Sequence, residues 1–168
     1  MNRLSLVLAM ALLASGTAAA VIDQTKPAPT YEAVLSRSWQ NVHNKILTMA
    51  KDTQFPDDKL SWKPHPDARS VLEELRHVTI GLEMTTAEAK GEQFDFAARE
   101  KADAGKPKTR ASVVAEMEAA IAASYPLVTS KPRPQLLGWL EHQGEHYGKL
   151  VTAYRANGIV PPISRPKS

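Results

Sequence analysis

The sequence predicts an all-α protein, built as a four-helix bundle. Four segments carry apolar residues at intervals of three and four positions, which is the spacing of one buried helix face. The strict alternation of apolar and polar residues that marks a half-buried strand is not found. Polar or proline-containing stretches separate the segments. At 168 residues, the chain is long enough for one core and too short for two ordinary domains.

The first predicted helix follows Thr30, whose side chain can cap its amino end. Its apolar stripe consists of Leu35, Trp39, Val42, Ile46 and Met49. The connection over residues 55–69 contains three prolines, which exclude a regular helix there. We expect Leu60 and Trp62 in this connection to fold back on the core.

A capping box predicts the start of the second helix. The Ser70 side chain can accept a hydrogen bond from the backbone amide of Glu73, whose carboxylate can reach back to Ser70. The apolar stripe of this helix is Val71, Leu75, Val78 and Leu82. His77 lies off the stripe, and Gly81 one turn later leaves room beside its ring. The segment over residues 91–108 is polar and rich in Lys, Asp and Gly, and we interpret most of it as loop.

The third predicted helix begins at Thr109 or Arg110 and ends near Pro126. The buried face of this helix is predicted from four apolar residues and one small residue: Val113, Met117, Ala120, Ile121 and Ser124. Because proline interrupts helical hydrogen bonding, we expect the helix to stop in this region.

A turn over residues 130–134 opens the fourth predicted helix, since proline is tolerated at a first helical position. The helix runs to about Asn157, and Gly158 is a natural left-handed stop. At about 100° per residue, one arc of this helix is apolar. It contains Leu136, Leu140, Tyr147, Val151 and Tyr154, with Trp139 and Leu150 at its edge. His142 and His146 lie just beyond that edge, where a cleft between helices is expected.

The composition excludes several classes of function. The net charge of +3 comes without a basic run or a cluster of aromatics among basic residues, so nucleic acid is not an expected partner. The chain has no cysteine, which excludes disulfides, thiolate metal ligands and lipid attachment at a signal-cleavage site. Stability must therefore come from core packing and from any bound metal.

Residues 1–20 have the pattern of a cleaved signal peptide, with a short positive start, an apolar run and small residues before the expected cleavage site. A retained membrane anchor is the alternative, but the apolar run is too short to span a bilayer. Residues 21–29 are predicted to be a linker, and residues 30–168 the folded domain. The mature protein is expected to be periplasmic or secreted, without stable membrane insertion.

His142 and His146 are four residues apart in a predicted helix, so both imidazoles project from one face about one turn apart. An isolated pair of this kind is more often two ordinary surface or core histidines. A metal ion of the zinc type needs three or four ligands, and His77 is the best third candidate. Such a set leaves a coordination position open, and Glu73 is within helical reach of His77 as its outer partner.

Other polar residues are assigned more ordinary roles. We expect His43 to pack against Trp39 or to form a hydrogen bond near the site, and His65 to be exposed in its loop. Trp62, Trp139 and Tyr147 are expected in the core. Glu141 and Glu145 point away from the apolar arc and are interpreted as solvated. Gln143 follows His142 where a zinc peptidase has its catalytic glutamate, so a metalloprotease is not expected.

The segments over residues 69–77 and 142–162 together resemble the DinB superfamily. The resemblance implies an up-down-down-up four-helix bundle, often a homodimer, with three histidines that bind zinc or nickel. Those histidines correspond to His77, His142 and His146. Relatives with established activity include thiol transferases and a maleylpyruvate isomerase, which use low-molecular-weight thiols.

Two classes of function follow from the sequence. The first is a metal-dependent enzyme that hydrolyses a small-molecule substrate or transfers a thiol, although no catalytic base can be named. The second is a cell-envelope protein that binds a metal or a small ligand without turnover. Loss of activity on chelation and in a metal-ligand variant would favour the enzyme.

Overall fold

The computed structural model describes residues 27–104, 109–130 and 133–166, and over this part of the chain it is all-helical, as the sequence predicts. The predicted signal peptide and most of the predicted linker lie outside the described residues. The α-helices are α1 (Tyr31–Lys51), α2 (Val71–Lys90), α3 (Phe96–Ala104), α4 (Arg110–Ser130) and α5 (Gln135–Ala156). Two short 3-10 helices are η1 (Asp57–Lys59) and η2 (Pro162–Ser164).

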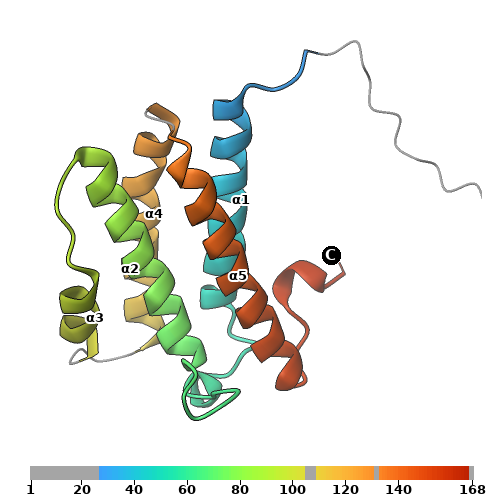
Figure 1. The fold of residues 1–168 in the computed structure, drawn as a ribbon. Helices are drawn as coiled ribbons and strands as arrows, with labels where there is room; N and C mark the ends of the chain where they lie inside the picture. Colours follow the sequence, from blue (N-terminus) through green and yellow to red (C-terminus); the bar gives the residue numbers. More distant parts are fainter. Residues whose placement is uncertain (1–26, 105–108, 131–132, 167–168) are drawn as a thin grey trace, which may run out of the picture.

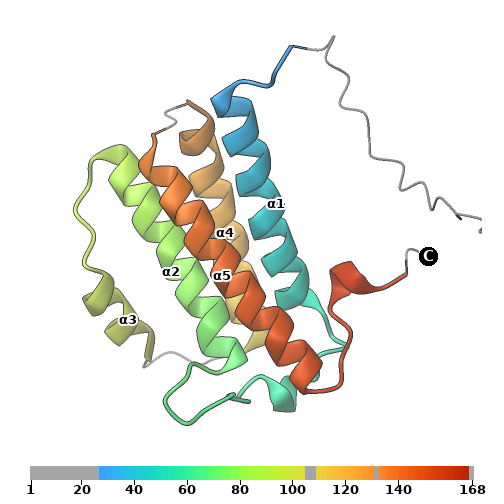
Figure 2. The same cartoon turned by 45° about the vertical axis from the view of Figure 1, so that its right-hand side comes forward.

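The four long helices pack side by side, while the short helix α3 lies outside them against α2 (Figures 1 and 2). Helices α1 and α5 run in one direction, and α2 and α4 run in the other (Figure 1). Both α1 and α2 contact α4 and α5. This arrangement sets the first turns of α2 beside the later turns of α5.

The helix ends follow the predicted local chemistry. The Thr30 side chain accepts a hydrogen bond from the backbone nitrogen of Ala33 at 3.2 Å. At the start of α2, the Glu73 amide donates to Ser70 Oγ at 3.2 Å, and the Ser70 amide donates to the Glu73 carboxylate at 2.8 Å. Gly158 has φ of 73°, a left-handed conformation that suits a helix stop.

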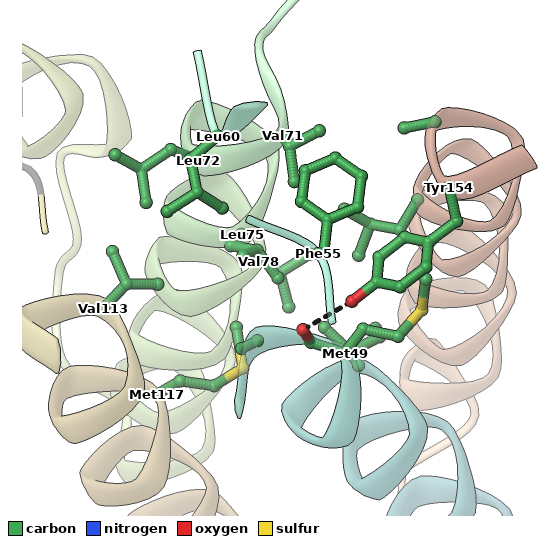
Figure 3. Packing of buried hydrophobic residues seen from close by; sticks show 14 residues of the cluster. Met49, Phe55, Leu60, Val71, Leu72, Leu75, Val78, Val113, Met117 and Tyr154 are labelled. Atoms are coloured by element: carbon green, nitrogen blue, oxygen red, sulfur yellow. Dashed lines mark hydrogen bonds between the residues drawn. The ribbon is translucent and has the colours of Figure 1, made fainter. Parts of the chain in front are cut away.

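A large apolar cluster fills one half of the core (Figure 3). It joins residues of α1, α2, α4 and α5 with residues of the connection after α1, so the predicted inward folding of Leu60 and Trp62 is confirmed. Phe55 from the same connection lies against Tyr154, with ring centroids 4.6 Å apart. The Tyr154 hydroxyl donates to the backbone oxygen of Met49 at 2.9 Å, which fastens α5 to the end of α1.

Helix α4 does not stop at Pro126 but continues to Ser130, so the predicted end was wrong. Pro126 is exposed, and one turn of helix beyond it carries Val128, which is buried in a second apolar cluster with Leu35 and Trp39. Burial of Val128 offsets the missing proline hydrogen bond. Among the described residues, α4 is also the one helix long and apolar enough to cross a membrane, although part of this apolar surface faces α1 and α2.

The helix α3 was not predicted, because most of residues 91–108 was interpreted as loop. In α3 the buried side chain is that of Asp103, and the helix shows no apolar stripe. Ion pairs to α2, rather than an apolar stripe, make much of its attachment, so the periodicity that reveals the long helices is absent here.

The buried residue His43 packs against Trp39, with ring centroids 4.7 Å apart, as the sequence predicts. Its Nδ1 lies 2.8 Å from the Trp39 backbone oxygen and carries the donated proton, because a carbonyl oxygen can only accept. Burial lowers the pKa of His43 from 6.5 to about 4, and the hydrogen bond to Trp39 opposes this shift. The ring is therefore neutral at physiological pH.

The pH dependence of stability should report on His43. Its pKa is lower in the folded protein than in the unfolded chain, so the folded state loses stability as pH falls from 6.5 toward about 4. By pH 4.5 this loss should reach about 2–3 kcal/mol. Urea unfolding of metal-free protein at pH 7 and pH 4.5 should therefore show a smaller pH effect in His43→Gln than in the wild type. Equal pH effects would contradict the assignment.

Candidate metal centre

The structure brings together the three histidines that the sequence singles out. His77 projects from α2, while His142 and His146 project from successive turns of α5. One ring nitrogen from each forms a group whose members all lie within 4.8 Å of one another. The shortest of these approaches joins the Nε2 atoms of His142 and His146, which are 2.9 Å apart.

The three rings sit at different depths. The side chain of His146 is 1% exposed, that of His77 is 13% exposed and that of His142 is 42% exposed. The group therefore runs from the interior between α2 and α5 to the surface. A ligand can reach it from the side of His142.

A carboxylate faces the Nδ1 atom of each histidine. His146 Nδ1 lies 2.6 Å from Glu74 Oε1, and His77 Nδ1 lies 2.9 Å from Glu100 Oε1. His142 Nδ1 is 3.4 Å from Glu145, which is largely exposed. When Nδ1 carries the proton that the carboxylate accepts, Nε2 is left with a free electron pair. This is how outer carboxylates orient histidine ligands in metal sites.

The sequence predicted Glu73 as the outer partner of His77, but the partner of the His77 Nδ1 atom is Glu100. The carboxylate of Glu73 accepts from the Ser70 amide and lies 3.2 Å from Lys63. The Nδ1 atom of His77 faces α3, where it contacts the carboxylate of Glu100. Because α3 was interpreted as loop, this partner could not be found from helical spacing.

Glu74 is the least expected member of the site. It is 5% exposed, and its Oε1 lies between His146 Nδ1 and Lys149 Nζ, the latter at 3.6 Å. Burial alone would raise the pKa of Glu74, but the hydrogen bond from His146 and the nearby Lys149 and Arg69 bring that pKa below its usual value. Glu74 is thus held as a carboxylate. In the sequence it resembles any acidic residue of a first helical turn.

Helix α3 brings a second carboxylate and an aromatic wall to the site. Phe96 packs edge-on against His77, with ring centroids 5.4 Å apart. Burial lowers the pKa of His77, which outweighs the raising effect of its hydrogen bond to Glu100, so the ring is neutral and able to bind metal. Arg76 of α2 pairs with Asp103 of α3, and both side chains are buried.

A second arginine extends this ionic attachment. Arg99 of α3 donates to both oxygens of Glu83 in α2, at 2.7 and 2.9 Å, and to Asp103 at 3.3 Å. It also lies 3.8 Å from Glu116 of α4. Charged pairs thus hold the helix that positions Glu100.

A cavity of about 210 Å³ is lined by all three histidines of the cluster. Apart from the histidines its walls are a glycine, three large apolar side chains and one amide: Gly81, Met84, Phe96, Trp139 and Gln143. A larger cleft of about 790 Å³ runs between the connection before α2 and α5, with Glu74 and Glu145 in its lining. The same two carboxylates contact the rings of His146 and His142.

The buried face of α5 differs from the predicted arc. Gln143 and His146 are buried, whereas Tyr147 and Val151 are only partly buried. The prediction counted apolar residues alone, and Gln143 turns inward although it is polar. His146 is consequently inside the protein rather than at the rim.

The remaining histidines lie outside the cluster. The side chain of His65 is 68% exposed, as the sequence predicts. His43 belongs to α1 and is engaged with Trp39. Glu145 is exposed as predicted, yet it faces His142 rather than bulk solvent alone.

Comparison with known proteins gives one match. The model of the DinB superfamily matches residues 35–152, which include all three histidines. Searches of curated proteins and of solved structures each gave no match.

The attachment of α3 can be tested through Asp103. Asp103→Asn removes the carboxylate that pairs closely with buried Arg76 and leaves this guanidinium the longer contact to Glu116 at 3.6 Å, and a poorly compensated buried charge is unfavourable. The extensive contacts of α3 with the long helices are those with α2. We therefore expect α3 to detach locally. Hydrogen exchange in residues 96–104 should accelerate by about tenfold or more, which corresponds to roughly 1.4 kcal/mol.

The matched control is Asp58→Asn, in which an exposed aspartate of η1 undergoes the same change. It should leave exchange in α3 unaltered. Unchanged exchange in α3 of the Asp103 variant would show that the ionic contacts do not hold the helix.

Proposed function

The chain belongs to the DinB superfamily, and from this premise we propose that it is a divalent-metal-binding protein whose ion is held by His77, His142 and His146. Zinc and nickel are the ions that the resemblance implies, and imidazole nitrogens suit both. The directions of the four long helices in Figure 1 support the up-down-down-up bundle that we propose for this family member. We further propose that it acts outside the cytoplasm, on the strength of residues 1–20.

The close approach of two Nε2 atoms is the observation that carries this proposal. His146 uses its Nδ1 proton on Glu74, so its Nε2 has a free electron pair, and the Nε2 of His142 lies only 2.9 Å away. In the metal-free protein a proton on His142 Nε2 can bridge the two nitrogens as a hydrogen bond, and a metal ion can take the place of that proton. His77 supplies a third nitrogen from the opposite helix.

The geometry of the donors fits a metal ion of the zinc type. With bonds of about 2.0–2.1 Å in a tetrahedral site, neighbouring nitrogens are roughly 3.3–3.4 Å apart. The nitrogens of His142 and His146 are 2.9 Å apart, and all three candidate ligand atoms lie within 4.8 Å. Small rotations of the rings suffice to reach the bonded arrangement. Glu74 and Glu100 already hold two of the rings by their outer nitrogens.

A divalent ion held by three neutral imidazoles supplies Lewis acidity at its open position and polarises a bound small ligand. That chemistry supports the metal-dependent hydrolysis or thiol transfer expected from the resemblance. The described residues that line the cavity include no carboxylate, because all three acids lie on the Nδ1 sides of the rings. This favours the second candidate, metal-dependent binding of a small ligand without turnover.

Elemental analysis of the purified mature protein tests the proposal. The wild type should retain about one zinc or nickel ion per chain after dialysis, while His146→Ala should lose it, because three nitrogen ligands fall to two. His65→Ala is the matched control, since it removes an exposed histidine outside the cluster and should retain the metal. Equal metal content in all three proteins would contradict the site. Ligand conversion that stops on chelation and in the His146 variant would identify an enzyme.

The three outer carboxylates should contribute unequally to metal affinity. Glu74→Gln should weaken zinc binding by about 10- to 100-fold, because the buried carboxylate both orients His146 and raises its basicity. Glu100→Gln should have a smaller effect, since Glu100 is partly exposed. Glu145→Gln should change the affinity less than about threefold, since exposed pairs contribute little.

Competition with a chromophoric zinc chelator would measure these affinities. The reverse order, with Glu145→Gln as the most damaging change, would show that burial does not set the contribution of each carboxylate.

A further inference from the structure

The side chain of Gln143 is a buried polar group that the metal-binding role does not use. It is 2% exposed and lines the cavity shared by the three histidines. Its Oε1 is buried and has no hydrogen-bond partner. A buried amide oxygen without a partner costs about 1–3 kcal/mol, so a position of this kind needs a physical reason.

Gly81 explains how the amide fits. A methyl group at Gly81 would lie 3.0 Å from Gln143 Nε2, which is tighter than ordinary van der Waals contact. Gly81 lies inside α2, where glycine is less favourable than alanine by roughly 1 kcal/mol. The missing side chain makes room for the NH₂ end of the amide at the wall of the cavity. The oxygen Oε1 is enclosed without a partner, and the nitrogen Nε2 is the end that lies beside Gly81, which lines the same cavity.

The rest of the cavity makes the amide distinctive. Its other non-histidine walls are the side chains of Met84, Phe96 and Trp139, which offer apolar surface. Among the non-histidine side chains that line the cavity, Gln143 and the indole N–H of Trp139 are the groups able to form hydrogen bonds, and Gln143 is the one amide. An amide N–H is a donor, so it selects an acceptor atom.

We propose that Gln143 is a specificity-determining residue, an inference that rests on the proposed metal site. Its Nε2 donates a hydrogen bond to an acceptor oxygen of the ligand that the metal holds. The ligand class is a compact carboxylate or carbonyl compound, with one oxygen for the metal and another acceptor for the amide. Its body is apolar, to match the walls of a cavity of about 210 Å³. A donor fixed in an enclosed site also stabilises negative charge on such an oxygen.

Acetate and thiocyanate are suitable probes of the cobalt(II)-loaded protein. Both are monoanions that bind metal ions, but only acetate has a second carboxylate oxygen for the amide. Gln143→Met keeps the length of the side chain and removes its donor. The dissociation constant of acetate, from visible absorption of cobalt, should rise about tenfold, as for one lost hydrogen bond to a charged group. That of thiocyanate, and the affinity for cobalt itself, should change less than about twofold.

Gly81→Ala tests the same contact without altering Gln143. The new methyl group should displace Nε2 and weaken acetate binding, while alanine maintains helix stability. Gly138→Ala is the matched control, because this helical glycine of α5 has no atom within 4 Å of an added Cβ. It should leave acetate binding unchanged.

The outcomes separate the two proposals. Cobalt uptake with acetate affinity unaffected by Gln143→Met, or with both anions weakened equally, would overturn the role of Gln143 alone. Tighter acetate binding by Gln143→Glu would also overturn it, because a carboxylate cannot donate and repels the probe. Failure of the wild-type protein to take up metal would overturn the proposed function and this inference with it.

Discussion

The hydrogen bond between Glu74 and His146 is the contact on which the rest of the site depends. It joins α2 to α5 inside the protein, where neither group can be solvated freely. Glu74 belongs to the first turn of α2, and the positive end of the helix dipole favours a carboxylate there. Once Nδ1 of His146 faces this carboxylate, its Nε2 must point to the opposite side, toward His142 and the cavity. The orientation of one buried ring thus fixes the face on which a metal can bind.

The long helices were predictable because apolar periodicity and end chemistry agree along them. Ser70 and Glu73 form the predicted capping box, and Gly158 adopts the left-handed stop. Helix α3 escaped the same reasoning, since its attachment depends on Arg76 and Asp103 rather than on an apolar stripe. An ion pair between residues far apart in sequence leaves no periodic signal. The end of α4 was also placed too early, because the burial of its last turn outweighs a proline that local rules treat as a stop.

The site was predictable in its ligands and not in their surroundings. The spacing of His142 and His146, with His77 as the third candidate, indicates which nitrogens can meet. It does not indicate which way each ring turns, because that depends on carboxylates from other helices. Glu100 could be identified only after α3 was placed, and Gln143 only after the true buried face of α5 was known. A polar residue that points inward is invisible to any count of apolar positions.

The charges around the histidines explain why an anionic ligand suits this cavity. Glu74 Oε1 lies near both His146 and Lys149, and the same pattern recurs at Glu100 Oε1, which lies near His77 and 3.4 Å from Arg69. These two carboxylates therefore each have a basic neighbour, while the exposed Glu145 adds one further negative charge beside His142. A divalent cation adds charge that these acids do not neutralise. Since the cavity walls bring no further acid, an anion at the open position is the group that restores the balance.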